Sequence, residues 1–313
     1  MRAYFLLLLV VIFYAGNILT GKALSDLPPL TIAFFRVFIA FLVLLPLGYR
    51  SAWQSRRLFL QHRKPLLLLT LTGVALFNTL IYSALQFTSA TNVSVLEASV
   101  PAATVALSFW LLRERLRAIQ WFGVVLSMCG ALWVVTNGQL MSLADLSWNI
   151  GDAIMAAAAV SWAVYSIAVK KYLHLFPSYG AVLVMTGLSV MILLPVMAAE
   201  WLVVGVPQIG GGHWSGLVYL GVFPSVIALM LYNRAVAVLG ASQTSVFLNF
   251  VPVFTMLGAY LLLDESISGM QLLGAALVMC GVFFTTRDTR TARGKGSRPA
   301  REPRKDAAPE EIP

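Results

Sequence analysis

The sequence predicts an all-α integral membrane protein whose ten transmembrane helices form two inverted five-helix repeats. Three observations lead to this fold class. The chain is 59% hydrophobic and only 11% charged, whereas soluble domains carry about 25% charged residues. Its apolar runs reach the roughly 20 residues needed to cross a bilayer, and they are continuous rather than alternating, which excludes a β-barrel. The third observation is that one stretch of the chain occurs twice.

Residues 84–130 align without a gap to residues 235–281 at a constant shift of 151 positions, and 16 of the 47 aligned positions are identical. The matches include Pro101/Pro252, Glu114/Glu265 and the Met-Cys-Gly run that ends each copy. One register is therefore kept across two apolar segments, a proline and a charged turn. This pattern indicates a duplicated unit.

Ten apolar segments follow one another along the chain and predict the individual helices. The segments are residues 3–24, 30–49, 65–87, 91–112, 119–136, 151–172, 178–200, 214–238, 241–263 and 269–286. Five lie in a first repeat (1–137) and five in a second repeat (151–286). A linker loop (138–150) joins the repeats, and a basic tail (287–313) follows them.

Positive charge predicts how these segments are oriented. With a cytoplasmic N-terminus, 20 of the 22 basic residues lie in cytoplasmic connections or the tail, Lys22 lies on the opposite side, and Arg36 lies within the second segment. This bias follows the positive-inside rule and places both termini in the cytoplasm. Because each repeat has an odd number of segments, the second repeat must be inverted relative to the first, a plan that recurs in transporters.

The tail explains much of the net charge of +9, since eight basic residues lie between Arg287 and Lys305. Its proline, glycine and alanine content predicts a disordered cytoplasmic segment that is attracted to anionic lipid headgroups. It has no interleaved aromatic residues, so nucleic acid is not expected as a partner. The expected partners are the lipid bilayer and a small-molecule substrate.

The repeated motifs resemble the paired EamA domains of the drug/metabolite transporter superfamily. The resemblance rests on the shared Pro…Thr…Leu-x-Glu…Gln-x-x-Gly…Cys-Gly pattern, on Phe13-Tyr14-Ala15-Gly16-Asn17 before Lys22, and on Trp162-Ala163-Val164-Tyr165 before Lys170. It covers about residues 3–286. It implies a bacterial inner-membrane carrier, commonly an exporter of amino acids, other metabolites or drugs, with a central cavity between its halves.

Glu97 is the only acidic residue expected deep within a membrane segment, and Arg36 enters its own segment to a similar depth. Intramembrane charges are costly, and they face a cavity or a partner. Glu97 is therefore a candidate site for proton coupling or for a substrate ammonium group, with pairing to Arg36 as the alternative. The corresponding positions of the second repeat hold Leu248 and Met185.

Uncharged polar and aromatic residues supply the other candidates for the substrate cavity. Amides can orient a zwitterionic substrate, although they also join helices in membranes. Aromatic side chains can form a cavity wall or ordinary core. The candidates are Asn17, Asn78, Asn233, Asn249, Tyr82, Trp162 and Tyr165.

Pro101 and Pro252 occupy matching positions in the fourth and ninth segments, where each is expected to kink its helix as a hinge or as a fixed packing feature. No nucleotide-binding loop or catalytic set is present, so an enzyme, a cofactor and a metal site are not expected. The predicted function is export of small metabolites such as amino acids by alternating access. A proton is a candidate coupling ion, and a homodimer is a candidate assembly. A drug or lipophilic-cation exporter and a non-transporting receptor or scaffold are the alternatives.

Overall fold

The structure is a computed structural model that describes residues 2–112, 117–136, 138, 149–232, 248 and 250–287. The elements of these residues are helical, and no strand is found among them. Asn233, Asn249, most of the expected linker and the tail beyond Arg287 lie outside the described residues.

Five helical spans precede the linker, and their bounds follow the predicted segments closely. The elements are α1 (Arg2–Ala23), α2 (Pro29–Gln54), the short α3 (Arg56–Gln61), α4 (Arg63–Leu69), the π-helical η1 (Thr70–Leu76), α5 (Phe77–Phe87), α6 (Ala90–Ala98), α7 (Val100–Leu112) and α8 (Ala118–Val135). The third span is the run from α4 through η1 to α5. The fourth span consists of α6 and α7.

The second part of the described chain begins at Asn149. It contains α9 (Ile150–Tyr172), the 3₁₀ turn η3 (Leu173–Leu175), α10 (Ser178–Val204), α11 (Gly211–Val222), the π-helical η4 (Phe223–Ile227), α14 (Val251–Leu262) and α15 (Gly269–Arg287). Helical structure continues from η4 to Tyr232, where this described stretch ends.

Eight helical stretches of the described chain are long and apolar enough to cross a membrane, and the apolar helices Val251–Leu262 and Gly269–Thr285 are shorter. Large apolar side chains on their outer faces remain uncovered, such as Trp110, Leu202 and Leu262. Such faces are stable against lipid, since a helix satisfies its own backbone hydrogen bonds there. The chain is therefore a multi-pass membrane protein.

The fourth span differs from the single continuous helix expected over 91–112, because it is interrupted at Ser99. Pro101 has no backbone N–H and cannot complete the helical bond to the carbonyl of Glu97. The backbone N–H of Ser99 donates to the carbonyl of Leu96 at 3.1 Å, which ends α6 at this point. Pro101 thus lies in the first turn of α7, and Pro252 likewise lies in the first turn of α14.

Two glutamates cap helices that belong to distant parts of the chain. Glu200 accepts from the backbone N–H groups of Leu30 and Thr31 (3.3 and 3.1 Å) at the start of α2. Glu265 accepts from the backbone N–H groups of Ala90 and Thr91 (2.9 and 3.3 Å) at the start of α6. A carboxylate there satisfies free donors and complements the helix dipole. Both contacts link the chain before the linker to the chain after it.

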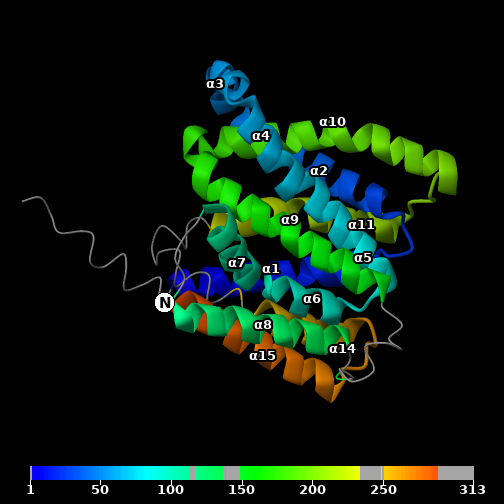
Figure 1. The fold of residues 1–313 in the computed structure, drawn as a ribbon. Helices are drawn as coiled ribbons and strands as arrows, with labels where there is room; N and C mark the ends of the chain where they lie inside the picture. Colours follow the sequence, from blue (N-terminus) through cyan, green and yellow to red (C-terminus); the bar gives the residue numbers. More distant parts are fainter. Residues whose placement is uncertain are drawn as a thin grey trace, which may run out of the picture.

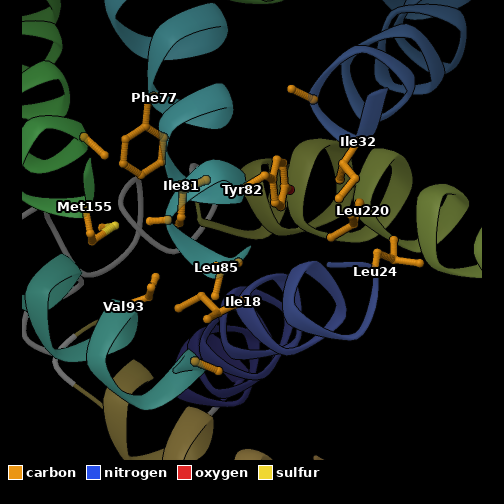
Figure 2. Close-up of a cluster of buried hydrophobic side chains, with 14 of the residues drawn as sticks. Ile18, Leu24, Ile32, Phe77, Ile81, Tyr82, Leu85, Val93, Met155 and Leu220 are labelled. Atoms are coloured by element: carbon orange, nitrogen blue, oxygen red, sulfur yellow. The ribbon is translucent and has the colours of Figure 1, made fainter. Parts of the chain in front are cut away.

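The apolar core lies where α1, α2, α5, α6 and α9 meet (Figure 2). Ile18, Ile32, Ile81, Leu85 and Met155 are fully buried there. These side chains come from segments far apart in sequence, so the core holds both parts of the chain together. The buried ring of Tyr82 belongs to this core (Figure 2) and brings a polar hydroxyl into it.

Helices α8 and α15 lie side by side along one edge of the molecule, and α10 lies at the opposite edge (Figure 1). A glycine permits each close approach between α8 and α15. A Cβ added to Gly123 would lie 2.6 Å from the carbonyl oxygen of Gly281, and one added to Gly130 would lie 2.9 Å from that of Gly274. The two helices are therefore antiparallel with their backbones in direct contact.

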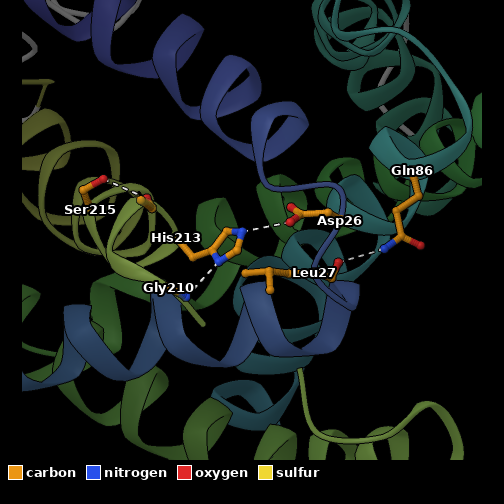
Figure 3. Close-up of polar contacts among 7 residues, drawn as sticks. Asp26, Leu27, Gln86, Gly210, His213 and Ser215 are labelled. Atoms are coloured by element: carbon orange, nitrogen blue, oxygen red, sulfur yellow. Dashed lines mark hydrogen bonds and ion pairs between the residues drawn. The ribbon is translucent and has the colours of Figure 1, made fainter. Parts of the chain in front are cut away.

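The connections at one end of the spans are also held by polar contacts (Figure 3). The Nε2 atom of His213 lies 2.8 Å from Oδ2 of Asp26, and its Nδ1 accepts from the backbone N–H of Gly210 at 3.0 Å. Gln86 donates to the carbonyl of Leu27 at 3.0 Å. These bonds fix the turn between α1 and α2 against α11 and α5.

Candidate functional site

Arg36 is the centre of a polar network among otherwise apolar helices. Its Nε donates to the hydroxyl of Ser225 at 3.0 Å, and its Nη1 donates to the hydroxyl of Tyr82 at 2.5 Å. The guanidinium carbon also lies 5.7 Å from the centre of the Tyr82 ring. Three contacts from two separate helices thus fix the position of this charge, which a membrane segment otherwise accommodates poorly.

The network continues from Tyr82 to the first helix. Tyr82 is 1% exposed and donates its hydroxyl hydrogen to Oδ1 of Asn17 at 3.1 Å; Asn17 is also buried. Arg36, Tyr82, Asn17 and Ser225 therefore form one chain of hydrogen bonds across α2, α5, α1 and η4. The sequence identified the first three residues as candidates, and the structure brings them together.

Ser225 is the member of this network that sequence reasoning missed. It lies in η4, and its hydroxyl donates to the carbonyl of Leu220 at 2.8 Å while accepting from Arg36. A π-helical turn shifts the backbone register and leaves carbonyls for other donors. The neighbouring Pro224 was the one signal in the sequence, since proline interrupts regular helical bonding.

A second π-helical stretch, η1, lies against α9. Ser161 donates to the carbonyl of Thr72 at 2.9 Å. The ring of Tyr165 packs directly on Gly73, where a Cβ would collide with the ring. Such π-helical turns occur often at functional sites, and here each of the two carries contacts to candidate residues.

Trp162 and Tyr165 form an aromatic group with Phe77. The ring centres of Phe77 and Trp162 are 4.4 Å apart, and those of Trp162 and Tyr165 are 5.0 Å apart. Asn78, next to Phe77, is buried and donates to the carbonyl of Val74 in its own span at 2.7 Å. Its amide nitrogen thus makes a local bond, and Asn78 does not join the Arg36 network among the described residues.

Glu97 does not join the Arg36 network in the described chain. Its side chain is partly exposed, and it makes no hydrogen bond or ion pair within 4.0 Å in the part of the chain that the structure describes. A direct ion pair of Glu97 with Arg36, the alternative that the sequence left open, is therefore not found among these residues.

A pocket of about 460 Å³ opens between the end of α1 and the start of α11. It is lined by Thr20, Ala23, Leu24, Gly210, Gly212, His213, Ser215 and Gly216. Thr20 is less than one helical turn from Asn17. The pocket thus forms a hollow at one end of the spans, on the helix that also carries Tyr14 and Asn17.

A second polar cluster lies where the spans end. Asp152 is 2% exposed and accepts from the hydroxyl of Thr88 at 2.6 Å and from the amide of Asn92 at 3.4 Å. Gln271 donates in turn to the amide oxygen of Asn92 at 2.7 Å. Lys22 donates to the carbonyls of Leu85 and Thr88, both at 2.8 Å. The described chain contains no group of three metal-ligating side chains.

Comparisons with known proteins agree with this architecture. The model of the EamA-like transporter family matches residues 1–136 and 149–287. A solved crystal structure, described only as that of a protein, matches with a TM-score of 0.62 at 19% identity, over 95% of this chain and 99% of the solved chain. That likeness establishes a shared fold.

Several curated proteins are similar in sequence over most of their length. The "Uncharacterized transporter YyaM" of Bacillus subtilis is 27% identical over 69% of this chain and 71% of its own. The "Probable amino-acid metabolite efflux pump" of Salmonella typhimurium is 28% identical over 93% and 98%. The "Probable terminal-alkyne amino-acid exporter" of Streptantibioticus cattleyicolor is 27% identical over 74% and 75%.

Proposed function

Because this chain belongs to the EamA-like transporter family, we propose that it is a secondary-active exporter of small metabolites such as amino acids. The observation that carries this proposal is the Arg36 network, which extends across four spans. A charged group within a membrane span is costly, and in membrane proteins such a group often marks the pathway of a substrate or an ion. Two of the relatives described above are named as amino-acid exporters or efflux pumps.

The proposed mechanism is alternating access by two inverted five-helix halves. Packing in the described chain supports it, because equivalent spans contact each other: α2 with α10, α6 with α14, and α8 with α15. The glycine contacts are reciprocal, since the 151-residue shift converts the Gly123/Gly281 contact into the Gly130/Gly274 contact. The same shift relates residues 72–76 of η1 to 223–227 of η4.

Reciprocal contacts have a mechanical consequence. Two inverted copies of one unit can exchange their conformations, which turns a state open to one side into a state open to the other. The contacts of Glu265 with Ala90 and of Gln271 with Asn92 join the proposed halves at one end. In the proposed cycle these contacts break when that end opens, and the π-helical turns and the prolines at helix starts accommodate the movement.

The proposed setting is a bacterial inner membrane with both termini in the cytoplasm, as the distribution of basic residues favours. In this orientation Glu200 and Glu265 lie at the outer ends of the spans. Proton entry is the proposed driving reaction, with Glu97 as the coupling group. The exposed apolar faces of the spans, which include Trp110 and Leu202, are available for a homodimer contact within the bilayer.

Transport by the purified protein in liposomes tests this proposal. Vesicles loaded with a mixture of labelled standard amino acids should release at least one of them faster than protein-free vesicles when a proton gradient is imposed. Absence of both release and exchange for every solute in the mixture would remove the carrier and leave the receptor or scaffold as the remaining class.

A lipophilic-cation exporter is the second candidate, because Phe77, Trp162 and Tyr165 form an aromatic group between two spans and aromatic rings attract cations. The same vesicles loaded with tetraphenylphosphonium separate the two candidates. Release of this cation without release of any amino acid would favour the second.

A further inference from the structure

We propose that α3, together with the helix ends on either side of it, forms a docking surface for the headgroups of anionic phospholipids. We refer to residues 49–64 as the α3 surface. No member of the Arg36 network lies in it, so this surface has a role beyond the proposed transport function and independent of it.

The end of α2 brings the α3 surface to the level of the lipid headgroups. Helix α2 has 26 residues and is about 39 Å long, whereas the hydrocarbon core of a bilayer is about 30 Å thick. Residues 49–54 extend past the last apolar turns of this helix, and α3 follows them directly. Figure 1 shows α3 at the outer edge of the molecule. The surface is thus placed where headgroups, rather than acyl chains, surround the protein.

Packing on one side holds α3 in a fixed position. The buried ring of Phe59 stacks on Phe176, with ring centres 5.3 Å apart and an angle of 6° between the planes. Both rings belong to an apolar cluster that includes Leu66, Ala181 and Met185. The other side of α3 therefore faces outward in a defined orientation. A surface that is already ordered loses little conformational entropy when a ligand binds.

The outward side carries positive charge that nothing in the described chain neutralises. Its exposed basic residues are Arg50, Arg56, Arg57, Arg63 and Lys64. None of them has a carboxylate within 4.0 Å among the described residues. The sequence explains this, because residues 27–96 and 153–199 contain no aspartate or glutamate. A basic cluster of this size directly beyond a transmembrane helix is typical of anionic-lipid binding, and the arginine fork matches a phosphate.

Exposed apolar groups beside these charges favour a lipid surface over a soluble anion. Tyr49 and Trp53 are each more than half exposed and stack with ring centres 6.0 Å apart. The guanidinium carbon of Arg56 lies 4.8 Å from the centre of the Trp53 ring, and Leu60 in α3 is 73% exposed. Tyrosine and tryptophan prefer the membrane interface, and interfacial helices place apolar side chains beneath the headgroups that their basic residues bind.

Thermal melting of the full-length protein in a neutral detergent tests this surface, because a ligand that binds the folded state raises Tm. The probes are phosphatidylglycerol and phosphatidylcholine with the same acyl chains, and inorganic phosphate is the soluble control. We expect phosphatidylglycerol alone to raise Tm, by an amount that declines as added salt screens the charges. Native mass spectrometry of the same samples should show more bound phosphatidylglycerol than phosphatidylcholine.

Variants assign the effect to the α3 surface. The test variant combines four substitutions of exposed side chains, namely Arg56→Gln, Arg57→Gln, Arg63→Gln and Lys64→Gln. The matched control removes the same charge from the tail, by Arg293→Gln, Lys295→Gln, Arg298→Gln and Arg301→Gln. We expect the test variant to bind phosphatidylglycerol about 10- to 100-fold more weakly than the wild type. The tail variant should keep the full rise in Tm.

Two further variants refine the comparison. Leu60→Gln changes no charge and should reduce the rise in Tm by a smaller amount, because it removes only the exposed apolar side chain. If the fourfold test variant fails to fold, the double variant of Arg56→Gln with Arg57→Gln repeats the comparison with half of the charge removed.

Several results would overturn the α3 surface. They are an equal rise in Tm with phosphatidylcholine, an equal rise with inorganic phosphate, and an unchanged rise in the test variant. An equal loss in the tail variant would also overturn it, since net charge alone would then explain the effect. None of these measurements involves transport, so failure of the α3 surface would leave the proposed exporter intact, and absence of transport in vesicles would leave the α3 surface intact.

Discussion

Glu265 binds Thr91 twice, because its carboxylate accepts both the backbone N–H at 3.3 Å and the side-chain hydroxyl at 3.2 Å. Glu200 binds Thr31 in the same manner, at 3.1 and 3.2 Å. In each case a glutamate from a distant segment accepts hydrogen bonds from a threonine in the first helical turn. The glutamate thereby caps the N-terminus of that helix. The two contacts use the same chemistry to join the proposed halves at one end.

Glu265→Gln should destabilise the protein by about 1–2 kcal/mol, since a neutral amide loses the charge-assisted bonds and the favourable interaction with the dipole of α6. The apparent Tm in detergent would fall accordingly. Asp264→Asn is the matched control, because Asp264 is exposed and asparagine tolerates its positive φ of 52°. Equal Tm values for the two variants would show that the Glu265 contacts contribute nothing to stability.

Gly123→Ala should destabilise the contact between α8 and α15. The added methyl group would lie 2.5 Å from the backbone nitrogen of Thr285 and 2.6 Å from the carbonyl oxygen of Gly281, so the helices must separate. Overpacking of this kind costs about 1–3 kcal/mol. Gly269→Ala is the control, because no atom lies within 4 Å of an added Cβ there. Thermal melting of both variants provides the comparison, and unaltered Tm for Gly123→Ala would argue against the close packing.

Much of the fold could be predicted because its signals are local. Apolar runs of bilayer length mark the spans, and α1, α2, α8 and α9 begin and end within a few residues of the expected bounds, apart from the extension of α2 to Gln54. The π-helical register of η1 and η4 could not be predicted in this way, because it depends on packing partners rather than on composition. The break at Ser99 follows from Pro101 only once the neighbouring backbone bonds are known.

Less of the candidate site than of the fold could be predicted from the sequence. Arg36, Tyr82 and Asn17 could be selected because polar groups are conspicuous in apolar segments. Ser225 could not, since a serine in a membrane helix more often bonds its own backbone, as it also does here. The contacts of Asp152 and Glu265 likewise depend on which helix ends meet, which sequence periodicity does not specify.

The orientation proposed from charge predicts that a reporter fused after α15 faces the cytoplasm. Green fluorescent protein at that position should be fluorescent in a bacterial host, whereas alkaline phosphatase there should be inactive. The physical reason is that basic connections resist translocation. A phosphatase fused within the turn between α1 and α2 is the control and should be active. Reversed activities of the two phosphatase fusions would refute the orientation and move the Glu265 contacts to the inner side.

Glu97→Gln should abolish the dependence of transport on a proton gradient while leaving solute exchange at saturating concentrations. Glutamine keeps the size of the side chain but can neither take up nor release a proton, so a cycle that requires protonation of this group must lose its coupling. Exchange requires only that the loaded carrier changes its conformation.

The measurement is release of labelled solute from proteoliposomes with and without an imposed gradient, beside exchange against the same unlabelled solute. Glu97→Asp is the matched variant, because it retains an ionisable group and should keep part of the gradient dependence. Gradient-driven release by Glu97→Gln at the wild-type rate would exclude Glu97 as the coupling group. The coupling proton would then have to bind elsewhere, and the buried Asp152 beside Thr88 and Asn92 would be the next residue to substitute.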